Sequence, residues 1–237
     1  MKLEMFCLAF LFLPILAREE IAGGPIVSPE KFPFIARLVI QKGRLGSSTC
    51  TGTLVKDNLI LTARHCFKPD KKLYYFGTAT FYDRESKEFT VKMKLVKTYV
   101  KNNSSDIALA RLTRKVKDIT PLGFYTKKLS PGTTVKAAGY GMHGHNQNDE
   151  HLRHIDLKVA YDNGYKIGTK IGKNNAGPCE GDSGGPLLVQ GGDGWSVAGT
   201  LIGGGYSCED NTVSQAYPDD VYSSVRVIKS GDIRRYR

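Results

Sequence analysis

The residues best suited to chemistry surround a serine in the second half of the chain. Ser183 lies in Cys179-Glu-Gly-Asp-Ser-Gly-Gly-Pro-Leu187, where the flanking glycines can place its hydroxyl on an exposed, tight turn. Backbone N–H groups of such a turn can converge on one point and stabilise the oxyanion of a tetrahedral intermediate. Because a serine hydroxyl is a weak nucleophile, this chemistry also requires a neighbouring base.

A base and an acid that could orient it occur in two earlier motifs. His65 ends an apolar run in Thr62-Ala-Arg-His-Cys66, and Asp106 begins another in Ser105-Asp-Ile-Ala-Leu109, where a half-buried acid is otherwise out of place. The order histidine, aspartate, serine is one of the chain orders of the catalytic triad. Each motif alone also fits a core histidine, a strand-capping acid or an ordinary turn, but their joint occurrence predicts acyl-transfer chemistry.

A histidine-rich stretch, residues 142–154, raises the question of a metal site. Some of its spacings occur in zinc ligand sets. The stretch is also rich in Gly, Asn and Asp and lacks a framing pair of strands or helices, which favours an exposed loop, so we expect no metal. Its histidines are His143, His145, His151 and His154.

The elements that position these motifs are expected to be short β-strands. Apolar and polar residues alternate over 89–95, as in a strand with one buried face. Helical periodicity is weak, and only the C-terminal tail offers a turn or two of helix. Many short runs between turn signals predict an all-β sandwich or barrel. Residues 113–131 are predicted to connect two halves of the chain. The runs are 34–40, 51–55, 59–62, 74–78, 89–96, 107–112, 133–138, 155–159, 186–189, 197–202 and 221–225.

The beginning of the chain has the pattern of a secretory signal. An apolar run over 6–17 follows Lys2, is too short to span a bilayer, and ends at the small residue Ala17. We therefore expect a signal peptide over residues 1–17 and a secreted, extracellular protein without a membrane anchor. The overlapping sequons at Asn102 and Asn103 are candidates for glycosylation.

Composition excludes several classes of protein. The 237 residues are 41% hydrophobic and 24% charged, which excludes a disordered chain. The formal net charge is +11, but the basic residues are scattered and no nucleic-acid module accompanies them. A basic, soluble surface is therefore expected, without a nucleic-acid partner.

The cysteines indicate disulfides. Cys7 leaves with the signal, and an even number remains in a chain expected to enter an oxidising compartment. Two disulfides with three possible pairings follow, and the absence of a CxxC spacing argues against zinc ribbons and redox sites. The remaining cysteines are Cys50, Cys66, Cys179 and Cys208.

Together the motifs resemble those of the chymotrypsin/trypsin family of secreted serine endopeptidases. Ile21-Ala-Gly-Gly24 is also similar to the mature N-terminus of that family, and the resemblance extends to about residue 227. It implies two six-stranded antiparallel β-barrels with the active site in the cleft between them. The expected division is a signal over 1–17, an activation peptide over 18–20 and a peptidase domain over 21–237, with barrels at about 21–120 and 121–237.

The resemblance also assigns roles to individual residues. Ser183 would be the nucleophile, His65 the base and Asp106 its orienting acid, with the N–H groups of Gly181 and Ser183 as the oxyanion hole. The disulfides would be Cys50–Cys66 and Cys179–Cys208. A free Ile21 ammonium would pair with Asp182 after activation. No metal or organic cofactor is implied, the partners would be protein or peptide substrates and protein inhibitors, and a monomer is expected.

The expected substrate pocket predicts a broad preference with a basic component. Gly177 stands where a trypsin-type enzyme has its acid, while Asp220 falls at a second floor position. A register shift by one residue would place Asp219 there instead. Glu180 and Gly204 complete the residues expected to line the pocket.

Several positions depart from the family pattern. Arg64 replaces a small residue, Ile202-Gly203-Gly204 stands where Ser-Trp-Gly is usual, and Glu20 precedes Ile21 where trypsin-activated relatives have Arg or Lys. The stretch 158–177 is shorter than usual and lacks a disulfide common there. These departures keep open the alternative of a catalytically weak or silent protease-like binding protein.

Overall fold

The computed structural model describes residues 24–68, 72–83, 85–100, 105–142, 150–172, 176–207, 212–213 and 219–235. The expected signal and activation peptides, Ile21 and Cys208 lie outside these residues. So do the sequons and two histidines of the histidine-rich stretch, His143 and His145.

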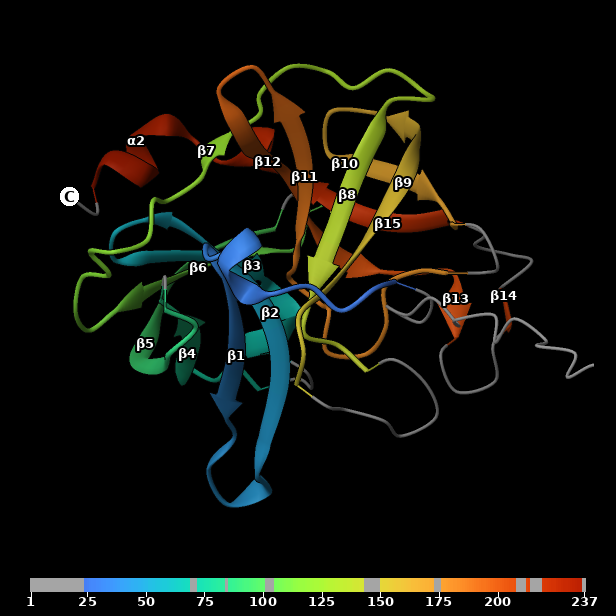
Figure 1. Cartoon of the computed structure of the whole chain (residues 1–237). Helices are drawn as coiled ribbons and strands as arrows, with labels where there is room; N and C mark the ends of the chain where they lie inside the picture. The colour runs from blue at the N-terminus through green and yellow to red at the C-terminus, as the bar shows by residue number, and fades with distance from the viewer. Residues whose placement is uncertain are drawn as a thin grey trace, which may run out of the picture.

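The first half of the chain forms a closed antiparallel barrel. Its strands are joined in the order β1-β2-β3-β6-β5-β4, and β4 pairs back with β1 (Figure 1). A short turn, η2 (Gly43–Leu45), projects between β1 and β2, and Leu45 at its end is 75% exposed. The strands are β1 (Ile35–Gln41), β2 (Ser47–Lys56), β3 (Leu59–Ala63), β4 (Phe76–Tyr82), β5 (Glu88–Tyr99) and β6 (Ile107–Leu112).

The second half forms another ring of strands beside the first. The order is β11-β8-β9-β10-β15-β12, and the antiparallel pairing of β12 with β11 closes the ring. The two-residue β7 adds to β12 in parallel, and β13 and β14 form a separate small sheet. The strands are β7 (Gly123–Phe124), β8 (Thr134–Gly139), β9 (Arg153–Asp162), β10 (Lys166–Lys170), β11 (Pro186–Gly191), β12 (Gly194–Gly203), β13 (Tyr206–Ser207), β14 (Thr212–Val213) and β15 (Asp219–Ser224).

Helical structure is sparse within the described residues. The last helix, α2 (Ser230–Arg234), follows the second barrel but contacts the first. Its Asp232 accepts hydrogen bonds from Lys97 Nζ at 2.5 Å and Tyr99 Oη at 2.9 Å on β5. No helix in this part of the chain has the length and apolar composition needed to cross a membrane. The helices are η1 (Pro29–Lys31), η2, α1 (Arg64–Phe67), η4 (Val225–Val227) and α2 (Ser230–Arg234).

The prediction of two closed six-stranded antiparallel barrels is confirmed. Every predicted apolar run overlaps one of the longer strands. Buried apolar residues of these strands fill the interiors of both barrels. Packing in the first barrel is so close that a side-chain carbon at Gly52 would lie 2.7 Å from Ile60 Cγ2 and 2.8 Å from Leu38 Cδ1. The division of the chain near residue 120 stays a prediction.

One of the longer strands was not predicted. β10 has a single large apolar side chain, Ile167, in its sequence Lys166-Ile-Gly-Thr-Lys170. It forms because β9 and β15 pair with it on both sides, so tertiary context rather than local pattern determines it.

The segment before the first barrel is attached to the second. Val27 donates its N–H to the carbonyl of Leu152 at 2.9 Å, and Ile26 forms an isolated bridge with Arg153 at the start of β9. The chain therefore crosses the edge of the second barrel before it enters β1.

Candidate active site

His65 and Asp106 meet at the end of two neighbouring strands. β3 and β6 are antiparallel with Ala63 opposite Ile107, so the residues just beyond this pair, on α1 and before β6, are brought together. His65 Nδ1 lies 2.6 Å from Asp106 Oδ2, and the His65 backbone N–H donates to Oδ1 at 3.0 Å. Both carboxylate oxygens thus hold the same residue, which fixes the position of the imidazole ring.

A residue of the second barrel supports this acid. The N–H of Asp106 donates to Ser223 Oγ on β15 at 2.8 Å, and Ser223 is fully buried. The sequence analysis missed this contact, since nothing distinguishes a serine near the end of a strand. It joins the backbone of Asp106, and not its carboxylate, to the second barrel, and Ile202 stands where the family pattern has a serine.

The disulfide predicted between Cys50 and Cys66 is present. It joins β2 to α1, with the Cα atoms 6.2 Å apart, and so holds the helix that carries His65. Cys179 is also disulfide-bonded. Its predicted partner, Cys208, lies outside the described residues, and that pairing stays a prediction.

The serine turn is attached to the first barrel. Thr51 N–H donates to the carbonyl of Ser183 at 2.9 Å, and the Thr51 hydroxyl donates to the carbonyl of Gly181 at 3.0 Å. Cys66 Sγ lies 3.5 Å from the same Ser183 oxygen, so Ser183 is adjacent to the helix that carries His65. Within the described residues, the N–H groups of Gly181 and Ser183 donate to no protein acceptor.

Glycine is required on both sides of Ser183. Gly181 and Gly184 have φ of +93° and +81°, in the left-handed region that other residues rarely adopt. A side chain at Gly184 would also collide with the hydroxyl of Thr62. The turn therefore keeps Ser183 partly exposed between two backbone positions that strongly favour glycine.

Asp182, next to Ser183, points into the protein. Its Oδ1 accepts from Gly141 N–H and its Oδ2 from Cys179 N–H, both at 2.8 Å. Burial raises the pKa of Asp182 to about 6, and these two donors and the charge of Arg153 oppose that rise. Asp182 thus fixes the serine turn to the residues buried behind it.

Asp220 is the buried acid of the pair 219–220. Along β15 it faces inward with Tyr222, and Asp219 is only partly buried. Among the described residues neither oxygen of Asp220 has a hydrogen-bond partner of normal geometry. Burial raises the pKa of Asp220 to about 7, which the nearby Gly205 N–H only partly offsets.

The other residues expected at the pocket differ in exposure. A side-chain carbon at Gly204 would lie 2.7 Å from Asp220 Oδ1, so glycine at this position avoids a collision with the buried acid. Gly177 is buried, and Glu180 is exposed with its carbonyl bonded to Met142 N–H at 2.7 Å.

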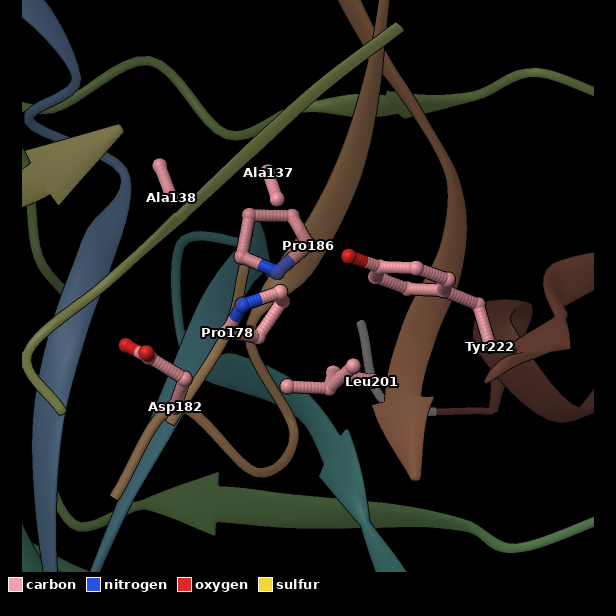
Figure 2. Close-up of a pocket in the computed structure, with 8 residues that line it drawn as sticks. Ala137, Ala138, Pro178, Asp182, Pro186, Leu201 and Tyr222 are labelled. Atoms are coloured by element: carbon pink, nitrogen blue, oxygen red, sulfur yellow. The ribbon is translucent and has the colours of Figure 1, made fainter. Parts of the chain in front are cut away.

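A small cavity lies behind the serine turn. Figure 2 shows Pro178, Pro186 and Leu201 between the carboxylate of Asp182 and the ring of Tyr222. Its volume is about 10 Å³, which is room for one water molecule and too little for a substrate side chain. This cavity is therefore distinct from any substrate pocket.

The predicted exposed loop over 142–154 is wrong at its C-terminal end. Leu152 and Arg153 are buried, and Arg153 and His154 begin β9. His154 packs edge to face on Phe32, and its Nδ1 lies 3.0 Å from Lys136 Nζ. Burial lowers the pKa of His154 to about 4, so the ring is neutral at pH 7.

One other group of potential metal ligands is found among the described residues. The ligand atoms of Cys50, His65 and Cys66 all lie within 4.8 Å of one another. Both sulfurs are joined in the disulfide, so they are not available as thiolates, which are the form that binds metals.

Comparisons with known proteins identify the family and the fold. The family model named Trypsin matches residues 21–227. Cathepsin G of Homo sapiens is 28% identical over 204 residues, which is 78% of this chain and 79% of that protein. Granzyme B of Homo sapiens is 29% identical over 206 residues, covering 78% and 83%. A solved structure described as "Structure of GrC" superposes with a TM-score of 0.68 at 23% identity, covering 90% of this chain and 98% of the other, and supports the fold.

Proposed function

This chain belongs to the trypsin family of serine endopeptidases, and we propose that Ser183, His65 and Asp106 carry out its catalysis. The observation that carries the proposal is the double contact between Asp106 and His65, at 2.6 Å to the ring and 3.0 Å to the backbone. A carboxylate on Nδ1 holds the proton on that nitrogen and leaves Nε2 as the base.

The proposed reaction forms and then hydrolyses an acyl-enzyme. Ser183 Oγ attacks the peptide carbonyl while its proton passes to His65 Nε2, and the N–H groups of Gly181 and Ser183 receive the oxyanion. When the intermediate collapses, the C–N bond breaks and His65 gives the proton to the leaving amine. Water then attacks the ester with His65 again as base, which releases the acid and restores the serine.

For substrate choice we propose a broad preference with a basic component. Asp220 supports the basic part, because within the described ranges neither of its buried oxygens has a hydrogen-bond partner of normal geometry, and a cationic side chain would stabilise such a carboxylate. Gly204 also supports it, since a side chain at this position would contact Asp220 Oδ1. The absence of an acid at Gly177 supports the acceptance of apolar side chains as well.

Secretion and activation form a further part of the proposal. The Cys50–Cys66 disulfide is typical of an oxidising compartment and supports a signal peptide over residues 1–17. An Ile21 ammonium, once freed, would pair with Asp182, whose burial makes a nearby cation favourable. Protein substrates and protein inhibitors are the expected partners.

Replacing the nucleophile tests the proposed catalysis. Ser183→Ala should lower turnover on a peptide substrate by about a million-fold, while thermal unfolding and secretion stay unchanged. Ser130→Ala, which removes an exposed hydroxyl outside the site, is the matched control and should keep full activity. Activity of Ser183→Ala within tenfold of the parent protein would refute the assignment.

A further inference from the structure

A groove on the outside of the first barrel carries positive charge that neither the triad nor the proposed substrate pocket uses. It has a volume of about 620 Å³ and is lined by residues of β5, the end of β6 and the turn that follows β6. The fold thus gathers here basic residues that are scattered along the sequence. Four of the lining residues are cationic and exposed, namely Lys94, Arg111, Arg114 and Lys115.

Two of these cations face each other across neighbouring strands. Lys94 on β5 is directly opposite Arg111 on β6, and the two strands lie side by side (Figure 1). Lys92, two residues before Lys94, is exposed on the same face of β5, since the intervening Met93 points into the barrel. Like charges in directly opposed positions destabilise a sheet. The barrel therefore contains a repulsion that a bound anion would relieve.

Protein carboxylates neutralise little of this charge. Lys115 forms an ion pair with Asp57 at 2.7 Å. The other three cations of the groove have no ion pair within the described residues. Lys94 Nζ instead lies 5.7 Å from the ring centroid of Phe76, a contact that holds the ammonium without cancelling its charge. The groove is consequently complementary to an anion with several charges.

The remaining lining residues indicate which kind of anion fits. They are Asn58, Val96, Leu112 and Thr113, so no aromatic ring is found among the described residues that line the groove. Binding of single-stranded nucleic acid relies on rings on which the bases stack. A sulfated polysaccharide requires none, because its sulfates accept charge-assisted hydrogen bonds from Lys and Arg and its hydroxyls bond to polar side chains such as that of Thr113.

We propose that this groove binds a chain of sulfated polysaccharide, with Lys94 and Arg111 at its centre. One sulfate lies between the two opposed cations and relieves their repulsion, and Arg114 and Lys115 contact further anionic groups of the same chain. Asp106 precedes the start of β6, whereas Arg111 is near its other end. The protein can therefore be held on a polysaccharide without obstruction of the proposed triad.

Direct binding tests the proposal. The probe is a heparin oligosaccharide, and isothermal titration calorimetry at several salt concentrations gives Kd. Lys94→Gln and Arg111→Gln should each weaken binding by at least about fivefold and reduce the slope of log Kd against log salt by about one, because one ionic contact is lost. Lys128→Gln removes the same charge from an exposed position outside the groove and should change Kd by less than about twofold.

Charge reversal separates a binding role from a structural one. Lys94→Glu places an acid directly opposite Arg111, which favours strand pairing but removes the site. The midpoint of its thermal unfolding should be at least equal to that of the parent protein. Heparin should raise the midpoint of the parent, since it binds the folded state, but not that of Lys94→Glu. A Lys94→Glu protein that is less stable than the parent, or that does not fold, would show that Lys94 serves the sheet itself and would overturn the proposal.

The choice of ligand has its own tests, and none of them depends on the proposed catalysis. Similar weakening by Lys128→Gln would mean that heparin responds only to the overall charge of the protein. Unchanged affinity for chemically desulfated heparin would exclude recognition of the sulfates. Tighter binding of a single-stranded oligothymidylate with the same number of charges would identify nucleic acid as the ligand. Each of these three results would overturn the proposal.

Discussion

Asp106, beside the histidine, and Asp220, in the second barrel, have very different surroundings. Asp106 is half-buried, and both of its oxygens have partners on His65. Asp220 is fully buried, and in the described residues neither oxygen has a partner of normal geometry. The hydrogen-bonding capacity of Asp106 is thus used within the protein, whereas that of Asp220 is not used by the described residues, as the proposed roles of the two acids require.

Asp182 is intermediate between these two acids. It is buried like Asp220, but two N–H groups and the charge of Arg153 compensate it. Burial accordingly raises its pKa to about 6, compared with about 7 for Asp220. Burial raises the pKa of both acids; two N–H groups and the charge of Arg153 oppose the rise at Asp182, whereas the negative charges of Asp219 and Asp182 add to the rise at Asp220.

The largest effect expected concerns the satisfied acid. Asp106→Asn should lower kcat by about ten-thousandfold, because an amide donor on His65 Nδ1 favours the wrong tautomer. Steady-state kinetics with a peptide substrate measure this, and circular dichroism should show an unchanged fold. Asp193→Asn, at an exposed acid, is the control. A loss of less than tenfold would mean that Asp106 does not orient the base.

A smaller effect is expected from removing the disulfide that holds the helix carrying His65. Replacing both Cys50 and Cys66 with serine removes the tie between β2 and α1, across a sequence separation of 16 residues. The free energy of unfolding should fall by about 3 kcal/mol, since the unfolded chain is no longer constrained. Urea unfolding gives the value, and a change below about 1 kcal/mol would show that the sheet alone holds the helix.

The unsatisfied acid should control substrate choice. Asp220→Asn is expected to lower kcat/KM for cleavage after Arg or Lys by about tenfold, or 1.4 kcal/mol, with little change after Leu or Phe. Asp219→Asn tests the alternative register and should leave both substrate types unaffected. Equal losses on basic and apolar substrates after Asp220→Asn would show that Asp220 does not meet the substrate side chain.

The smallest effect is a dependence of this preference on pH. The pKa of Asp220 is raised to about 7, so the acid is neutral below that pH and charged above it. The ratio of kcat/KM for an arginine substrate to that for a leucine substrate should therefore rise by about fivefold from pH 6 to pH 8. Taking the ratio cancels any effect of pH that is common to both substrates. A ratio that stays flat in the parent protein, or that rises equally in Asp220→Asn, would contradict the assignment.

The sequence alone predicted the strands and motifs that depend on the local pattern of residues. Alternation over 89–95 predicted β5, and the buried run after Asp106 predicted β6, because each strand has one or both faces in the core. The motifs around His65 and Ser183 led to the candidate site, since their spacing and glycines are local features.

Other features depend on partners that are distant in the chain. β10 has too few apolar residues to be recognised and forms only between its neighbours. Ser223 reaches Asp106 across 117 residues, which no local pattern records. Arg153 stands in a polar, histidine-rich stretch that predicts exposure, and its burial follows from strand register.

The closure of the first barrel bears on how this endopeptidase survives its own activity. A segment must leave its sheet before another molecule can cut it, and in a closed barrel every strand would lose hydrogen bonds along both sides. The turn between β1 and β2 has no such protection. Lys42 and Arg44 flank its tip, and Leu45 is 75% exposed. Within the described residues of this barrel, we expect self-digestion to begin at that turn, and the first fragment of an ageing sample should end at one of these two basic residues.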